Sequence, residues 1–140
     1  MNHIDFLISE VEKIEANHQN NECYYHVKQN LSEYYNWTLP PEYRKSLLGD
    51  KRSGWTMCSD IYYLMIMFYE HVTGHLPGVN FQMNDVAIRN LMKCLEAENT
   101  EKQAVAHLFY KCTSISESKR IRNASELKST EAFRFLIKEN

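Results

Sequence analysis

The sequence predicts an all-α fold: a single compact domain, residues 1–140, in which about six or seven helices surround a mostly buried central helix at residues 55–74. Three observations lead to this prediction. Glycine and proline together supply 7 of the 140 residues, roughly half of their usual share, so few turn residues are available for an all-β fold. Apolar residues recur at helical spacing in several segments. One of these segments is apolar around most of its circumference.

Two helices are expected in the first part of the chain. The first is amphipathic, because its apolar residues recur at spacings of three and four. They are Ile4, Leu7, Ile8, Val11 and Ile14. The second, which could also be the far half of one bent helix, repeats this spacing from Tyr24 to Tyr35. The chain must then be extended before Pro40 and Pro41, and a short helix is expected from Pro41 to Gly49, since glycine suits the left-handed position after a helix.

The segment from Trp55 to Gly74 is expected to form the central helix. Only nine uncharged residues separate Asp60 from Glu70, whereas a membrane-spanning helix needs about 20 apolar residues, so no membrane crossing is expected. At about 100° per residue, most of this helix is apolar and one narrow stripe is polar. The polar stripe comprises Thr56, Ser59, Asp60, Tyr63, Met67, Glu70, His71 and Gly74. We expect this stripe to face solvent; the alternative is that it lines a groove or contacts a partner.

Three further helices and one more polar segment are expected in the second half of the chain. Asn84 can cap a helix whose apolar face includes Ile88 and Leu91. The capping-box pattern S/T-x-x-E/Q, which marks helix starts, occurs at residues 100–103 and again at residues 114–117. The second occurrence is expected to begin a more polar segment that ends at Lys128. A short final helix is expected around Phe133, Leu136 and Ile137.

The four cysteines indicate a reducing compartment. Cys23, Cys58, Cys94 and Cys112 are far apart, and we expect each to be a buried free thiol on the apolar side of a helix. The first residues show an acid and helical periodicity, where a secretory signal needs a basic region followed by an apolar run. We therefore expect a cytoplasmic protein that does not contact a membrane and needs no cofactor.

Two local clusters suggest alternative functions. His71 and His75 have the i, i+4 spacing that can present two imidazoles to one metal ion, which would indicate a metal-dependent helical enzyme. The competing interpretation is two polar residues near a helix C-terminus, where the helix dipole favours imidazolium. Lys119, Arg120 and Arg122 form a basic cluster that could contact phosphates in a helical nucleic-acid-binding regulator. The competing interpretation of this cluster is a solvated helix face.

The main functional hypothesis is stoichiometric binding to another protein. The sequence contains no G-x-S-x-G or glycine-rich phosphate loop, so we assign no catalytic residue and do not favour an enzyme. Residues 1–50 carry a net charge of −4 and residues 101–140 a net charge of +3, and such asymmetry is typical of two different contact surfaces. Aromatic residues are enriched at interfaces. The candidate partner-binding residues are Tyr25, Tyr35, Trp37, Asp60, Tyr63 and Glu70. The expected classes are an inhibitor, an immunity protein or an adaptor; self-association remains an alternative.

Overall fold

The computed structural model describes residues 2–23, 39–47, 49, 54–75, 84–95 and 99–138. Within these ranges every regular element is helical, which confirms the predicted all-α class. The helices are α1 (His3–Gln19), α3 (Pro41–Leu47), α4 (Met57–Thr73), α5 (Asp85–Leu95), α6 (Asn99–Cys112), the 3-10 helix η1 (Glu117–Lys119), α7 (Ala124–Ser129) and α8 (Glu131–Lys138). The helix expected over residues 24–35 lies outside the described residues.

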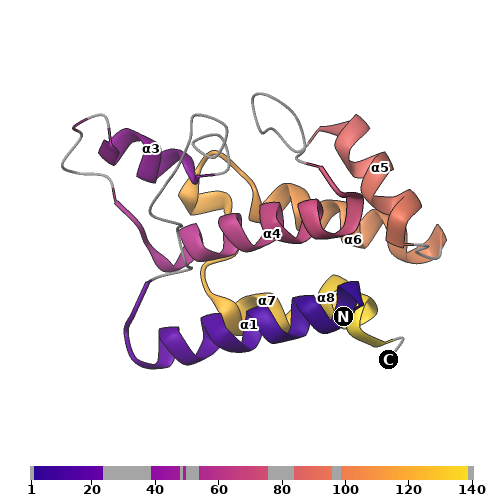
Figure 1. Ribbon diagram of the computed structural model, residues 1–140, viewed down its shortest axis with the longest axis horizontal. Helices are drawn as coiled ribbons and strands as arrows, with labels where there is room; N and C mark the ends of the chain where they lie inside the picture. The colour runs from indigo at the N-terminus through magenta and orange to yellow at the C-terminus, as the bar shows by residue number, and fades with distance from the viewer. Residues whose placement is uncertain are drawn as a thin grey trace.

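Helix α4 is the centre of the fold, as the sequence predicts. It contacts α1 along one side and α5 and α6 along others, and Figure 1 shows it running between α1 and α5. Eleven of its residues are buried, including every position from Ile61 to Ile66. The helix begins after Thr56, whose N–H donates to Ser59 Oγ at 2.9 Å, and it ends at Gly74 with φ of 81°. Burial of such an apolar surface is the dominant favourable term in folding.

The expectation that the polar stripe of α4 faces solvent is wrong for the first half of the stripe. Ser59 and Asp60 are 0% exposed and Tyr63 is 4% exposed. The reason is that α1 packs against α4, and His18 near the end of α1 lies 2.8 Å from Asp60. Glu70 and His71 in the second half of the stripe are only partly buried.

The helix expected at the first capping box is present as α6, but the second capping box does not begin an α-helix. Helix α6 begins at Asn99, so Thr100 already lies inside it. After α6 the chain forms η1 and then runs without regular structure to Asn123, which caps α7 by accepting the Glu126 N–H at 2.9 Å. Arg120 and Ile121 are both buried. The segment from Ser114 to Lys128, which the sequence predicts to be more polar, is therefore partly interior, because Arg120 and Ile121 pack into the core.

Other local predictions are confirmed. Helix α3 starts at Pro41, and Gly49 has a φ of 101°, in the left-handed region that favours glycine. Asn84 Oδ1 accepts the Ala87 N–H at 2.9 Å and so caps α5. Of the four cysteines expected to be buried, Cys112 is buried, Cys23 and Cys58 are only partly buried, and Cys94 is exposed on α5. None of the helices in the described ranges combines the length and apolar character that crossing a membrane requires.

Candidate functional site

The N-terminal half of α4 carries a buried carboxylate, Asp60, that two side chains hold in place. Asp60 Oδ1 accepts the Trp55 indole N–H at 2.6 Å, and Oδ2 lies 2.8 Å from His18 Nε2. The backbone N–H of Ala124 donates to His18 Nδ1 at 3.4 Å. Because that N–H can only donate, Nδ1 is the acceptor and the imidazole proton resides on Nε2, from which it is donated to Asp60. The contacts thus join α1, α4 and the start of α7.

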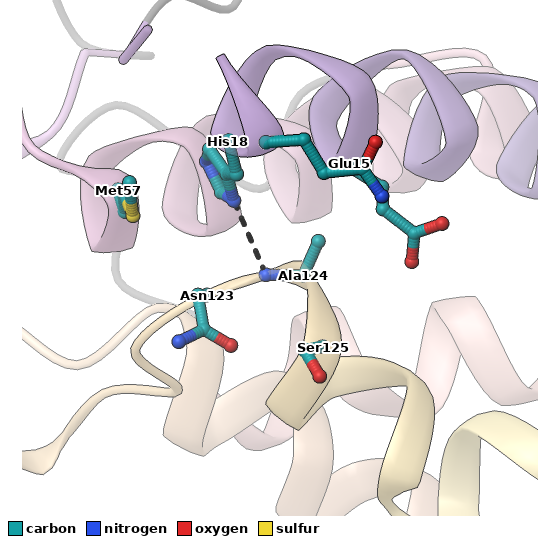
Figure 2. A pocket seen from close by; sticks show the side chains of 7 residues that line it. Glu15, His18, Met57, Asn123, Ala124 and Ser125 are labelled. Carbon is teal, nitrogen blue, oxygen red and sulfur yellow. Dashed lines mark hydrogen bonds between the residues drawn. The ribbon is translucent and has the colours of Figure 1, made fainter. Parts of the chain in front are cut away.

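A cavity of about 440 Å³ opens beside His18. Figure 2 shows His18 and Glu15 on the α1 side, Met57 on α4, and Asn123 to Ser125 opposite them. Glu15 Oε2 accepts a hydrogen bond from Lys128 Nζ at 2.6 Å. The Ala124 N–H already points at the His18 lone pair, and Asn123 Oδ1 is used to cap α7. The polar groups at this cavity therefore serve mainly to connect helices.

Glu42 and Arg120 form a second buried polar centre beside the start of α4. Arg120 Nη1 and Nη2 donate to Glu42 Oε2 and Oε1 at 2.7 and 3.1 Å, and Ser59 Oγ donates to Glu42 Oε2 at 2.6 Å. The guanidinium also donates to the carbonyl oxygens of Ser114 and Cys58, at 2.8 and 3.2 Å. This geometry satisfies both partners of a buried ion pair.

Residues 119–122 therefore do not form the single exposed basic surface that the sequence predicted. Arg120 is 2% exposed and points inward to Glu42, whereas Lys119 and Arg122 are exposed. Arg122 Nε donates to Glu126 Oε2 at 2.9 Å, and this hydrogen bond lowers the pKa of the Glu126 carboxyl. Of the three basic side chains, only Lys119 is both exposed and outside these two ion pairs, so it alone is available to contact a phosphate group.

Three potential metal ligands also lie beside the Glu42–Arg120 pair. Ligand atoms of Glu42, Cys58 and Glu117 are all within 4.8 Å of one another. However, the Arg120 guanidinium already supplies the positive charge that would compensate Glu42. Burial raises the pKa of the Cys58 thiol, which disfavours the thiolate that metals bind. We therefore interpret this group as part of a structural ion pair.

The structure does not join His71 and His75 in one site. His71 Nδ1 lies 2.9 Å from Nδ1 of His3 on α1. His75 lies beyond the end of α4 and is exposed, with its Nδ1 3.0 Å from Thr73 Oγ1. The left-handed conformation of Gly74 ends the helix between the two histidines, so the i, i+4 relationship predicted from sequence does not hold.

The candidate partner-binding residues are placed unevenly. Tyr25, Tyr35 and Trp37 lie outside the described residues. Asp60 is buried, and Tyr63 is buried with its ring 5.9 Å from the Trp55 ring, so neither can contact a partner directly in this conformation. Glu70 retains partial exposure.

No protein-family model matches the chain, and no curated protein or solved structure matches it either. Function is therefore inferred from the chain's own side chains.

A different surface contains exposed apolar groups. Val86 is 58% exposed, Tyr110 38% and Ile115 62%. The Tyr110 hydroxyl on α6 donates a hydrogen bond to Asp85 Oδ1 on α5, and Val86 is the next residue along α5. That hydrogen bond raises the pKa of Tyr110. We call Asp85, Val86 and Tyr110 the α5–α6 patch.

No signal in the sequence pointed to His3, His18 and Glu42, because none of them belongs to a local motif. Val86 carried a usable signal: it is an apolar residue that falls outside the Ile88 and Leu91 face of its helix. Their roles became visible only once residues from distant segments were placed together.

Proposed function

We propose that this protein acts by stoichiometric binding to another protein, as an inhibitor, immunity protein or adaptor does. The observation that carries the proposal is the α5–α6 patch, in which an exposed tyrosine on α6 is hydrogen-bonded to Asp85, the residue that precedes an exposed valine on α5. Single exposed apolar residues are ordinary on protein surfaces. A neighbouring pair that includes an aromatic ring is a better anchor, since tyrosine is enriched among binding hot spots.

The orientation of Tyr110 supports this role. Its hydroxyl donates to Asp85, so the ring is held in one direction before any partner arrives. Binding normally costs about 0.5–1.5 kcal/mol for each side chain that must be immobilised. A ring that is already restrained pays less of that cost. The patch therefore has apolar area and preorganisation, two properties that favour recognition by a protein surface.

The aromatic residues of the N-terminal part, Tyr25, Tyr35 and Trp37, remain a predicted second contact surface. Residues 1–50, which include these three, carry a net charge of −4, so a basic partner would be favoured there. We also propose a cytoplasmic location, which the free state of all four cysteines supports.

The experiment is affinity capture with the intact chain from its native host, followed by affinity measurement with the purified partner. Tyr110→Ala is expected to weaken binding by about 2 kcal/mol, or roughly 30-fold, the size of a hot-spot loss. Val86→Ala should weaken it less. Ile115→Ala is the matched control, because Ile115 is also exposed but lies outside the patch.

The outcomes separate the two surfaces. If the Tyr110 and Val86 variants keep full affinity and their native circular dichroism, the α5–α6 patch is not the contact surface. Loss of binding only on combined replacement of Tyr25, Tyr35 and Trp37 by alanine would assign the contact to the N-terminal surface. Capture of duplex nucleic acid with an affinity that falls as salt rises would instead favour the nucleic-acid alternative.

A further inference from the structure

His3 and His71 form a pair of imidazoles between the start of α1 and the end of α4. The two residues are 68 positions apart in sequence, and their Nδ1 atoms are 2.9 Å apart. The ring planes meet at 88°, with the centroids separated by 5.0 Å. In Figure 1 the first turn of α1 lies beneath the last turns of α4, which explains how these side chains meet. Both residues are partly buried.

The two Nδ1 atoms need different protonation states in this arrangement. One neutral imidazole must carry its proton on Nδ1 and donate it, while the other presents a lone pair on Nδ1 and carries its proton on Nε2. Burial and the neighbouring His3 lower the pKa of His71, which favours its neutral form. Neutral imidazole is the form that binds metal ions.

Packing holds one of the two rings in place. The Phe6 ring stacks on His71 with a centroid distance of 4.1 Å and an angle of 12° between planes. Phe6 and His3 are both on the first turn of α1, so the same helix supplies the stacking ring and the second imidazole. The His71 nitrogen is therefore directed at His3 by contacts other than their shared hydrogen bond.

We propose that His3 and His71 form a two-histidine site for a divalent ion of the zinc class, bound between the two Nδ1 atoms. Zinc lies about 2.0–2.1 Å from imidazole nitrogens, and a tetrahedral angle then sets the two nitrogens roughly 3.3 Å apart. The two nitrogens need to separate by about 0.4 Å from their present 2.9 Å, and the rings need to turn so that both lone pairs point at the ion. Water fills the other positions, because among the described residues no third histidine, cysteine or carboxylate joins this pair at ligand distance.

The proton balance of binding is simple. Both Nδ1 lone pairs are needed by the ion, so the ring that donates in the free protein moves its proton from Nδ1 to its own Nε2 through solvent. Both imidazoles remain neutral, and this tautomer change releases no net proton. The ion replaces one hydrogen bond with two coordinate bonds, and it thereby links α1 to α4. Because the folded chain presents both ligands together, binding should stabilise the fold.

The test uses the full chain without a histidine tag, treated with chelator and then returned to chelator-free buffer. Zinc titration is expected to show one ion per chain by calorimetry and a melting temperature that rises with zinc concentration. His3→Ala and His71→Ala should each weaken zinc binding by about tenfold or more. His75→Ala and His107→Ala are matched controls and should leave the affinity unchanged, since both of these histidines are exposed elsewhere.

Three results would overturn the proposal. The first is a wild-type chain whose melting temperature does not respond to zinc, and the second is unchanged zinc affinity in the His3 variant. The third is loss of binding in Cys58→Ser together with a thiolate charge-transfer band when Co²⁺ replaces zinc. That result would place the ion at Glu42, Cys58 and Glu117 instead. If His71→Ala does not fold, His3→Ala decides the matter, because His3 is the first residue of α1.

Discussion

Arg120 and Glu42 lie 78 positions apart in the sequence and form a bidentate ion pair in the interior, with Nη1–Oε2 and Nη2–Oε1 distances of 2.7 and 3.1 Å. The pair joins the first turn of α3 to the segment that precedes α7, and both residues contact the start of α4 through Ser59 and the Cys58 carbonyl. It acts as a structural connection among three parts of the chain, and it explains why a basic residue in a basic stretch is buried.

Breaking this ion pair should be strongly destabilising. Glu42→Gln or Arg120→Met leaves one buried charge without compensation, which typically costs about 3–5 kcal/mol of unfolding free energy. Urea denaturation monitored by circular dichroism measures the change. The matched control is Arg122→Ala, which removes the exposed Arg122–Glu126 pair and should cost at most about 1 kcal/mol. If Arg120→Met and Arg122→Ala lowered the unfolding free energy equally, the buried ion pair would contribute no more to stability than the exposed one.

Replacement of Asp60 by asparagine should weaken the contact between α1 and α4. The carboxylate accepts from both Trp55 and His18, and an amide presents its NH₂ group to one of these donors. A buried donor left without its acceptor costs about 1–3 kcal/mol. The unfolding free energy should fall accordingly, and the indole N–H proton of Trp55 should exchange faster with solvent in NMR spectra. Glu70→Gln, on the more exposed part of the same helix, should change neither quantity appreciably.

Gly74→Ala should destabilise the end of the central helix. Gly74 has a φ of 81°, and its N–H donates to the Glu70 carbonyl at 2.8 Å. A side chain in this left-handed conformation is strained, so we expect a loss of about 1 kcal/mol in a thermal or urea melt. Gly54→Ala is the control, because Gly54 has no positive φ and its added methyl group would meet nothing within 4 Å. A cost at Gly54 equal to that at Gly74 would contradict this assignment of strain.

Tyr110 should titrate at a higher pH than a free tyrosine. Its hydrogen bond to Asp85, then burial, raises its pKa above the ordinary value of 10.0. The folded state holds this proton more tightly than the unfolded state. The resulting stabilisation is therefore complete below about pH 10 and is lost as pH rises through the folded pKa. Ultraviolet difference absorbance of wild type and Tyr110→Phe isolates this titration. Asp85→Asn should return the pKa toward 10; an unchanged curve would argue against the hydrogen bond.

The features that sequence determined by itself are local ones. Burial of the Trp55–Gly74 segment follows from its apolar circumference, and its end follows from a glycine that can adopt positive φ. The caps at Asn84 and the helix after Pro41 follow in the same way, because each depends on residues within one helical turn. These short-range preferences act whatever the rest of the chain does.

Only the tertiary structure decided which polar residues are buried and which are paired. The sequence predicts that Asp60 and Arg120 are exposed, because burying an isolated charge is energetically costly. Each is buried because a partner from a distant segment satisfies it: His18 donates a hydrogen bond to the Asp60 carboxylate, and Glu42 compensates the charge of Arg120. The partner of His71 was likewise decided by tertiary packing. The sequence predicted His75, four residues along the chain, whereas the structure brings His3 of α1 to His71. Helical spacing fixes neighbours along one helix, whereas contacts between helices depend on how their apolar faces pack.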